Sequence, residues 1–299
     1  MSLSRPTPTV KPSGLPVGST ATSRALLLLW RVLALALLVG ISLLILYPAL
    51  WMLSTALKSD AQVFTYPPVW IPSPPQWHNF VDAWYGAPFT RYTINTTLYA
   101  LVVTAATVLA NSFVAYGFAK LRFPGRDVMF AVMLASMMIP GMVTMIPQYI
   151  LFSKLGWVGT YLPLVVPSFF ASAFFTFMLR QYFLTVPNEL SEAARVDGAS
   201  ELWIWWRVVM PLATPALATV AIFTFDGTWN SYVGPLLYLN DEKLYTLQVG
   251  LQFFRNGSQT QWQHLMAASL LVMLPVVAIF FAFQKYFVEG ASLSGSVKG

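Results

Sequence analysis

The sequence predicts an all-α integral membrane protein with six transmembrane helices and both termini in the cytoplasm. Of its 299 residues, 57% are hydrophobic and 9% are charged, whereas soluble domains carry about 25% charged residues. Six apolar segments approach the roughly 20 helical residues that cross a hydrocarbon core about 30 Å thick. These segments are residues 32–53, 92–118, 128–152, 160–182, 208–225 and 265–287.

The distribution of Lys and Arg predicts how these helices are oriented. An even number of spans places both termini on one side, and with the termini inside, the inner segments hold 12 of the 17 basic residues. This asymmetry follows the positive-inside rule. The outer segments hold the other five, which are Lys58, Arg91, Lys154, Lys243 and Arg255. Membrane orientation therefore accounts for the net charge of +6, and no nucleic acid partner is expected.

The chain divides into four regions. Residues 1–24 are rich in Pro, Ser and Thr and are expected to form a disordered cytoplasmic tail, because so polar a segment cannot bury a core. Residues 25–91 hold the first span and an outer loop; this span is longer than a signal-peptide core of about 7–15 residues and is expected to remain uncleaved. Residues 92–289 hold the other five spans, with an inner loop at 187–201. Residues 290–299 form a C-terminal cytoplasmic tail.

Proline lies inside or at the edge of most spans, where it removes a backbone donor and tends to kink its helix. These residues are Pro48, Pro140, Pro147, Pro163, Pro167, Pro211, Pro215 and Pro275. Kinked helices can open and close a path, although ordinary bundle packing explains them equally well. The outer segments 58–91 and 226–264 are rich in Pro and Gly, so short helices at most are expected there. Because the chain has no internal repeat, a two-fold channel requires a second chain.

The inner loop between the fourth and fifth spans has the features of a short helix followed by a turn. Pro187 and Asn188 stop one helix and start another, with Asn188 as the N-cap. The new helix is expected over residues 188–197; Gly198 then supplies the left-handed residue that ends it, and Ser200 caps the next helix. At helical spacing, one face of this helix consists of Leu190, Ala193, Ala194 and Asp197. A face of small and acidic residues suits the close approach of a partner that carries Lys or Arg.

The same loop contains a spaced pattern: Glu192-Ala193-Ala194, three residues, Gly198, nine residues, then Val208-Val209-Met210-Pro211. It resembles the signature EAA, three residues, G, nine residues, I-x-L-P of the membrane subunits of binding-protein-dependent ABC importers. Val208 and Met210 depart from that signature conservatively, in place of Ile and Leu.

From about Leu46 onward, the chain also resembles the maltose-type carbohydrate permeases, which have a MetI-like transmembrane domain. The matching words are Tyr47-Pro48, Asn95-Thr96, Ala115-Tyr116-Gly117-Phe118-Ala119-Lys120-Leu121-Arg122-Phe123-Pro124-Gly125, Arg180-Gln181-Tyr182-Phe183, Pro187-Asn188-Glu189-Leu190, Trp229-Asn230, Gln248-Val249-Gly250-Leu251 and Gly295-Ser296-Val297-Lys298-Gly299.

The resemblance implies a permease subunit of an ATP-driven importer in a bacterial or archaeal cell (inner) membrane, moving a di- or oligosaccharide into the cytoplasm. It implies that the partners are a second permease subunit, two cytoplasmic ATPase subunits, an extracytoplasmic substrate-binding protein, the sugar and membrane lipid. It assigns the coupling to the ATPase to Glu192, Ala193, Ala194, Asp197, Gly198 and Pro211. The tail at 290–299 either reaches between the ATPase subunits, as in some family members, or is a frayed end.

The sequence contains no recognisable catalytic machinery, so the protein is not expected to be an enzyme. It has no G-x-x-x-x-G-K-[ST] phosphate loop; ATP and Mg²⁺ are therefore expected on partner subunits, with no cofactor on this chain. With no cysteine and only two histidines, His78 and His264, it offers no metal cluster. Acidic residues avoid the middle of the spans, which disfavours ion coupling.

A sugar path needs hydrogen-bonding groups for hydroxyls and an aromatic face for the apolar side of the ring. The candidates are Asn111, Gln148, Trp229 and Asn230. Each has an alternative, since amides also join helices and Trp also lies at membrane interfaces. The interfacial position is the interpretation preferred for Trp203, Trp205 and Trp206.

Three alternative functions remain open at this point. A permease for glycerol phosphate or another polar solute would show a basic ligand in the path, and none is evident. An ion-coupled secondary carrier would transport without ATPase partners. A membrane scaffold would bind partners and transport nothing.

Overall fold

The computed structural model describes residues 21–255 and 260–295, and every regular element among them is a helix. Residues 1–20 of the predicted N-terminal tail and residues 296–299 of the predicted C-terminal tail lie outside the described residues. The rest of the predicted C-terminal tail belongs to the last helix, which ends at Gly295.

The chain forms two units, Met1–Trp51 and Met52–Gly299. In the first unit, all the described residues belong to α1 (Ala21–Ala56), which continues a short way into the second unit. α1 contains the apolar stretch Leu28–Ala56, which is long enough to cross a membrane.

Candidate membrane spans in the described residues agree with the six predicted segments. Four are single stretches: the one in α1, α4 (Phe89–Lys120), the stretch Leu162–Thr185, and residues Trp262–Gln284 of α15 (Trp262–Gly295). Two bent pairs of helices bring the number to six if each pair is one span. The all-α integral membrane class is thereby confirmed. The stretch Leu162–Thr185 is itself broken into α7 (Leu162–Val165), η1 (Val166–Phe169) and α8 (Ala173–Thr185).

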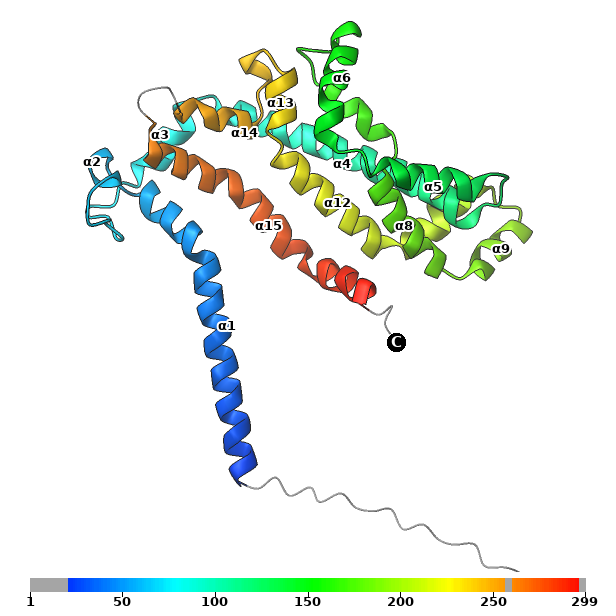
Figure 1. Ribbon diagram of the computed structural model, residues 1–299, viewed down its shortest axis with the longest axis horizontal. Helices are drawn as coiled ribbons and strands as arrows, with labels where there is room; N and C mark the ends of the chain where they lie inside the picture. Colours follow the sequence, from blue (N-terminus) through cyan, green and yellow to red (C-terminus); the bar gives the residue numbers. More distant parts are fainter. Residues whose placement is uncertain (1–20, 256–259, 296–299) are drawn as a thin grey trace, which may run out of the picture. The chain divides into compact units, whose positions relative to one another are not determined.

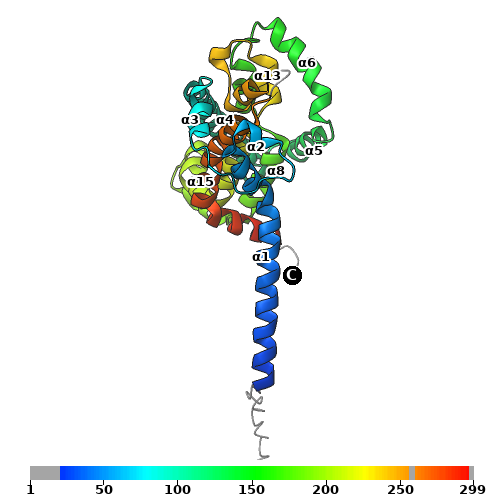
Figure 2. The same cartoon turned by 90° about the vertical axis from the view of Figure 1, so that its left-hand side faces the viewer.

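The third predicted span is bent rather than continuous. α5 (Arg126–Ser136) and α6 (Gly141–Lys154) meet at 95° across a break of four residues (Figure 2). Pro140 lies at the end of this break in an extended conformation, and a proline also restricts the residue before it to extended geometry. The predicted span over residues 128–152 is therefore divided into two helices beside Pro140, one of the prolines that were expected to kink their spans.

The fifth predicted span is also bent, at Ala213. α10 (Glu201–Ile204), the π-helical turn η2 (Trp205–Val209) and α11 (Met210–Leu212) form one arm, and α12 (Thr214–Trp229) forms the other at 84°. Pro215 has no N–H to donate to the carbonyl of Pro211, and Thr214 Oγ1 donates to that oxygen instead, at 2.7 Å. The bend lies between Pro211 and Pro215, two of the prolines that were expected to kink their spans, and it divides the predicted span over residues 208–225 into two arms.

α4 is the central helix of the second unit and packs along both α8 and α12 (Figure 1). In its C-terminal half, Ala115 and Tyr116 join a buried cluster with residues of α8 and of both arms of the bent pair. The other buried members of this cluster, called the α9-end cluster here, are Leu179, Phe183, Ile204, Val209, Ala213, Ala216 and Val220.

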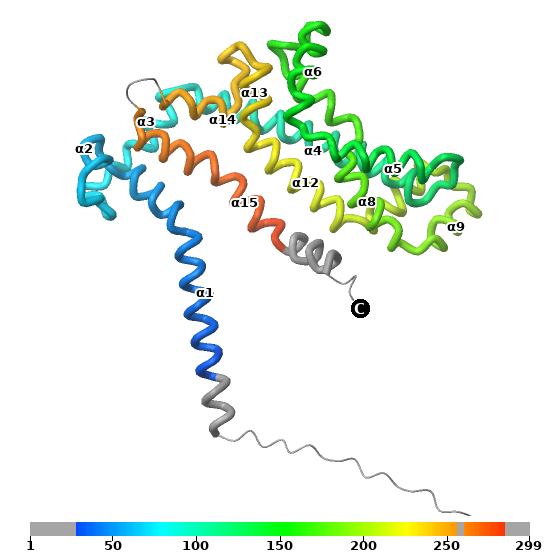
Figure 3. The backbone as a smooth tube through the Cα atoms, in the orientation of Figure 1, coloured from blue at the N-terminus to red at the C-terminus, as the bar shows by residue number. Residues whose placement is uncertain are grey.

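The second unit has two ends, shown in Figure 3. The α9 end contains the C-terminus of α4 and α9 (Asn188–Val196), and the α14 end contains the N-terminus of α4 and α14 (Leu247–Gly250). The predicted outer segments lie at the α14 end and contain only short helices, as expected. These are α2 (Asp60–Val63), α3 (His78–Tyr85), α13 (Val233–Tyr238), η3 (Glu242–Leu244) and η4 (Leu251–Phe254).

Candidate functional site

The predicted short helix of the inner loop is α9, which spans Asn188–Val196. Asp197 is its C-cap, and Gly198 follows in the left-handed conformation with φ of +81°. The next helix begins after Ser200, whose Oγ accepts a hydrogen bond from the Trp203 amide at 3.3 Å. The helix, the glycine stop and the serine cap are all confirmed.

The start of α9 differs from the expectation. The N-cap position is Pro187, and no side chain caps the helix. The amide oxygen of Asn188 instead accepts a hydrogen bond from Lys120 Nζ at 2.8 Å. Asn188 thus ties α9 to the C-terminal end of α4 and does not serve as the predicted N-cap.

α9 has one face against the bundle and one face free. Ser191 is 1% exposed, and Ala194 packs against the α9-end cluster. Ala193 is exposed, as are Leu190 at 45% and Val196 at 88%. The predicted face of Leu190, Ala193, Ala194 and Asp197 is divided, because Ala194 is partly buried against the bundle and the other three residues are exposed. The exposed residues of α9 include an apolar strip of Leu190, Ala193 and Val196 at helical spacing, beside the charged residues Glu189, Glu192 and Arg195.

Glu201 fastens α9 to α4 through two partners. Arg195 donates to both carboxylate oxygens of Glu201, from Nε at 2.6 Å and from Nη2 at 3.2 Å. Tyr116 of α4 donates its hydroxyl to Glu201 Oε2 at 2.5 Å. The hydrogen bonds that Arg195 donates to the Glu201 carboxylate raise the pKa of Arg195, so this guanidinium stays charged.

Lys120 adds a second attachment on the same side of α4. Besides Asn188, its Nζ donates to the carbonyl oxygen of Val186 at 2.5 Å. The loop is therefore held at both ends of α9, by Lys120 before it and by the Arg195–Glu201–Tyr116 group after it. Motif spacing alone did not indicate these four residues, since the bond between Tyr116 and Glu201 joins positions 85 residues apart.

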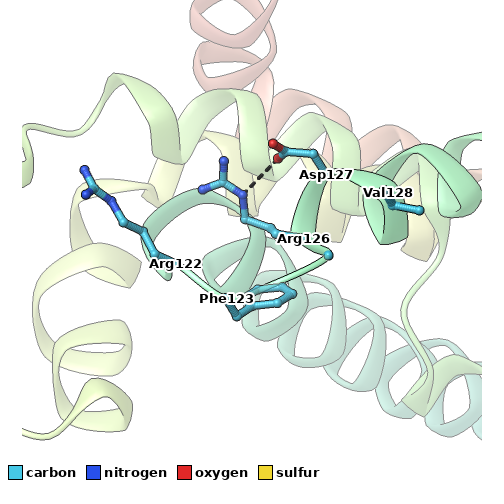
Figure 4. A pocket seen from close by; sticks show the side chains of 6 residues that line it. Arg122, Phe123, Arg126, Asp127 and Val128 are labelled. Atoms are coloured by element: carbon cyan, nitrogen blue, oxygen red, sulfur yellow. Dashed lines mark hydrogen bonds and ion pairs between the residues drawn. The ribbon is translucent and has the colours of Figure 1, made fainter.

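A groove of about 700 Å³ lies between α9 and the turn that follows α4. Its charged lining residues are Lys120, Arg122, Arg126, Glu192, Arg195 and Glu201. A second hollow of about 420 Å³ shares Arg122 and Arg126 with it, and there Arg126 Nε pairs with Asp127 at 3.0 Å (Figure 4). Glu192, the acidic residue of the predicted Glu192-Ala193-Ala194 pattern, thus lines the same groove as four basic side chains.

Of the remaining pattern residues, Asp197 and Gly198 are exposed beside the free face, and a Cβ on Gly198 would meet no atom within 4 Å. Pro211 lies in the short arm next to the bend, away from α9 in sequence. Trp203 and Trp206 are each about half exposed, and their interfacial position stays a prediction. Trp205 packs edge-on against Phe113, with ring centroids 5.4 Å apart.

The four predicted path residues are not brought together. Asn111 is fully buried, and its amide oxygen accepts bonds from Ser172 N at 2.8 Å, Ser172 Oγ at 3.2 Å and Thr176 Oγ1 at 3.1 Å. Trp229 is 2% exposed, and its Nε1 donates to the Val272 carbonyl oxygen at 3.0 Å. In this conformation both side chains form hydrogen bonds to neighbouring helices.

Gln148 and Asn230 are exposed, on α6 and at the end of α12 respectively. Gln148 makes only a long 3.5 Å contact with Thr144 Oγ1. Asn230 lies between Asp226 and Gln248, to which it is hydrogen-bonded. No group of three or more His, Cys, Asp or Glu residues that could hold a metal occurs in the described ranges.

Replacing Asn111 by Leu is expected to destabilise the bundle without changing the exposed surface. Interhelical hydrogen bonds in membranes contribute about 0.6 kcal/mol each on average, so the three accepted bonds amount to about 2 kcal/mol. Thermal unfolding in detergent measures the loss, and Gln148→Leu is the control that should leave the midpoint unchanged. Equal midpoints for Asn111→Leu and the unmodified protein would contradict this role.

Comparison with known proteins identifies the family. Residues 108–292 match the family described as binding-protein-dependent transport system inner membrane component, and the chain belongs to that family. It is 34% identical over 256 residues to the probable ABC transporter permease protein YurM of Bacillus subtilis, covering 85% of this chain and 84% of that protein.

Other relatives differ in the solute that their names give. The chain is 34% identical over 262 residues to the sn-glycerol-3-phosphate permease UgpE of Yersinia enterocolitica, covering 85% of this chain and 92% of UgpE. It is 33% identical over 214 residues to the arabinooligosaccharide permease AraQ of Bacillus subtilis, covering 72% and 75%. A solved bacterial ABC transporter that imports the acidic polysaccharide alginate is similar with a TM-score of 0.76 and 25% identity, covering 90% of this chain and 98% of that one.

The protein is therefore an ABC importer permease of the inner membrane, and its relatives are permease subunits rather than enzymes. The family fits the multi-helix membrane architecture found above. The relatives include both sugar and glycerol-phosphate permeases, so the family by itself leaves the solute class open.

Proposed function

We propose that this chain is the permease subunit of an ATP-driven importer that moves a carbohydrate, a di- or oligosaccharide, into the cytoplasm. The observation that carries the proposal is α9: a short helix with a free apolar strip, fastened to the bundle by charged and buried contacts on its other side. Such a helix can dock on a separate subunit and pass a displacement to α4. The AraQ relative supports a saccharide as the solute.

The proposal requires four further chains. Two cytoplasmic ATPase subunits supply the work and bind ATP and Mg²⁺, and one of them receives α9 through Glu192, Ala193 and the residues beside Gly198. A second permease subunit completes the path, and an extracytoplasmic binding protein delivers the sugar. The similarity to an alginate importer supports assembly with ABC subunits.

The orientation follows from the same assignment. The α9 end lies in the cytoplasm together with both termini, and the α14 end faces outward. Large apolar side chains project from the segment after α2 at that end, with Tyr66 95% exposed, Ile71 86% and Phe64 78%. Large exposed apolar side chains suit a protein partner, and we assign this segment to contact with the binding protein.

Transport by the assembled complex tests the proposal. Proteoliposomes that contain this chain, the partner permease and the ATPases should accumulate labelled maltotriose or arabinotriose only with internal ATP and external binding protein. An ion-coupled carrier would instead accumulate solute without the ATPases, and a scaffold would accumulate none. Uptake by this chain alone under an ion gradient would refute the proposal.

A further inference from the structure

α12 carries a single charged residue, Asp226, within an otherwise uncharged sequence. The span was predicted to end at residue 225, but the helix continues to Trp229, so Asp226 lies one turn inside it. The side chain is exposed in this chain. Because an ionised carboxylate facing hydrocarbon is costly, acidic residues in spans face water-filled cavities or paired groups.

No cation pairs with Asp226 in the part of the chain that the structure describes. Its hydrogen-bonded neighbour is Asn230, whose Nδ2 donates to Asp226 Oδ1 at 2.9 Å and to the Asp226 carbonyl oxygen at 3.1 Å. Gln248 Nε2 in turn donates to Asn230 Oδ1 at 3.1 Å. Hydrogen bonds thus connect the three side chains in series, from α12 to α14, at the α14 end.

This arrangement leaves acceptors available. Asp226 Oδ2 and Gln248 Oε1 make no hydrogen bond within the described residues. Asn230 orients the carboxylate, since its Nδ2 donates to both the carbonyl oxygen and Oδ1 of Asp226. Preplaced acceptors of this type suit hydroxyl donors.

An apolar groove adjoins the carboxylate. A hollow of about 190 Å³ between α12 and α15 is lined by Asp226 and by apolar residues. The apolar residues are Ile222, Phe223, Phe225, Val276, Ile279 and Phe280. Phenylalanine rings beside a carboxylate match the two sides of a saccharide, whose hydroxyls need acceptors and whose C–H faces need apolar surface.

The same groups disfavour an anion. α12 has no other charge, α14 has none, and α15 has none from its start to Gln284. A phosphate ester would meet the Asp226 carboxylate with no Lys or Arg supplied by these helices, and like charges repel most strongly where water is partly excluded.

We propose that Asp226, Asn230 and Gln248 form a binding site for a neutral polyhydroxylated solute at the α14 end of α12, and that the Asp226 charge excludes phosphate esters from it. The inference rests on the proposed transport function and names its solute class. It adds Asp226 and Gln248 to the predicted path residue Asn230.

A cysteine reporter tests the site directly, because the chain has no cysteine of its own. Gly227 adjoins Asp226, and a Cβ there would meet no atom within 4 Å. In the complex assembled with its partner subunits, Gly227→Cys should react with both a cationic and an anionic methanethiosulfonate. The ratio of the cationic to the anionic reaction rate should be about tenfold higher at this cysteine than for a free thiol. Asp226→Asn should reduce that factor to about twofold or less.

Gly156→Cys is the matched control, since Gly156 lies in an open turn after α6, outside this site. The ratio of its reaction rates with the two reagents should equal the ratio measured for a free thiol. Maltotriose or arabinotriose should slow the reaction at Gly227→Cys, whereas sn-glycerol 3-phosphate should not.

Three results would overturn the inference. The first is no reaction at Gly227→Cys, which would mean that lipid or the partner permease covers this face. The others are a Gly227→Cys reaction rate that neither saccharide changes, and a rate that sn-glycerol 3-phosphate slows as much as the saccharides do. ATP-driven uptake measured in the same vesicles separates the two proposals. Loss of uptake with intact protection would refute the transport function alone, and intact uptake without charge selectivity would refute the site alone.

Discussion

Gly198→Asp is expected to abolish ATP-driven uptake while the protein remains in the membrane. The residue has φ of +81°, a conformation that costs a side-chain-bearing residue about 1–2 kcal/mol. A new side chain there would meet no atom of this chain within 4 Å, so it would project into the space that the ATPase is proposed to fill. A carboxylate in that interface blocks docking of α9. Vesicle uptake and membrane fractionation measure the two parts of the expectation.

Gly156→Asp is the matched control for this variant. Gly156 also has a positive φ, of +70°, and open space around its Cβ position. The same backbone strain and the same added charge are therefore introduced away from α9. Near-normal uptake is expected in the control, and uptake by Gly198→Asp equal to that of the control would contradict docking at α9.

Glu201→Ala is expected to reduce uptake about tenfold and to leave ATP hydrolysis in the assembled complex largely intact. The substitution removes the acceptor for both Arg195 bonds and for the Tyr116 hydroxyl. Arg195 and Glu201 are partly solvent-exposed, so their attraction is screened and modest. The larger effect is mechanical, because α9 loses its attachment to α4 on one side. Uptake and ATPase rate are measured on the same preparation.

Glu189→Gln provides the comparison, because Glu189 is an exposed acid of α9 outside the Arg195–Glu201–Tyr116 group. It should retain uptake. Tyr116→Phe should reduce uptake on its own but add nothing to Glu201→Ala, since both changes remove the same contact. Additive losses would show that Tyr116 acts elsewhere.

Local signals in the sequence predicted local structure well. The glycine that ends α9 and the serine that caps the next helix were identified because each acts on its own backbone. The six apolar segments also reappear as candidate spans. The prolines beside both bends were identified as places where a helix tends to kink, but the angles of 95° and 84° were not predicted, because the surrounding packing sets them.

The site depends on contacts that span the chain, and these could not be read from the sequence. Asn111 and Trp229 were predicted to line a sugar path because of their residue types, yet both are buried between helices. Nothing in the spacing joined Tyr116 to Glu201 or Gln248 to Asn230. Asp226 was missed because the predicted span ended one residue too early to include it.

The right-angled turn at Ala213 makes α12 a lever with its pivot beside α9. The helix has 16 residues and is about 24 Å long at 1.5 Å per residue. A tilt of about 10° at the pivot would therefore sweep the far tip sideways by about 4 Å. Asp226 and Asn230 lie at that tip, so a small displacement at the α9 end would be enlarged at the α14 end, by enough to break the hydrogen bonds of a solute held at the proposed site.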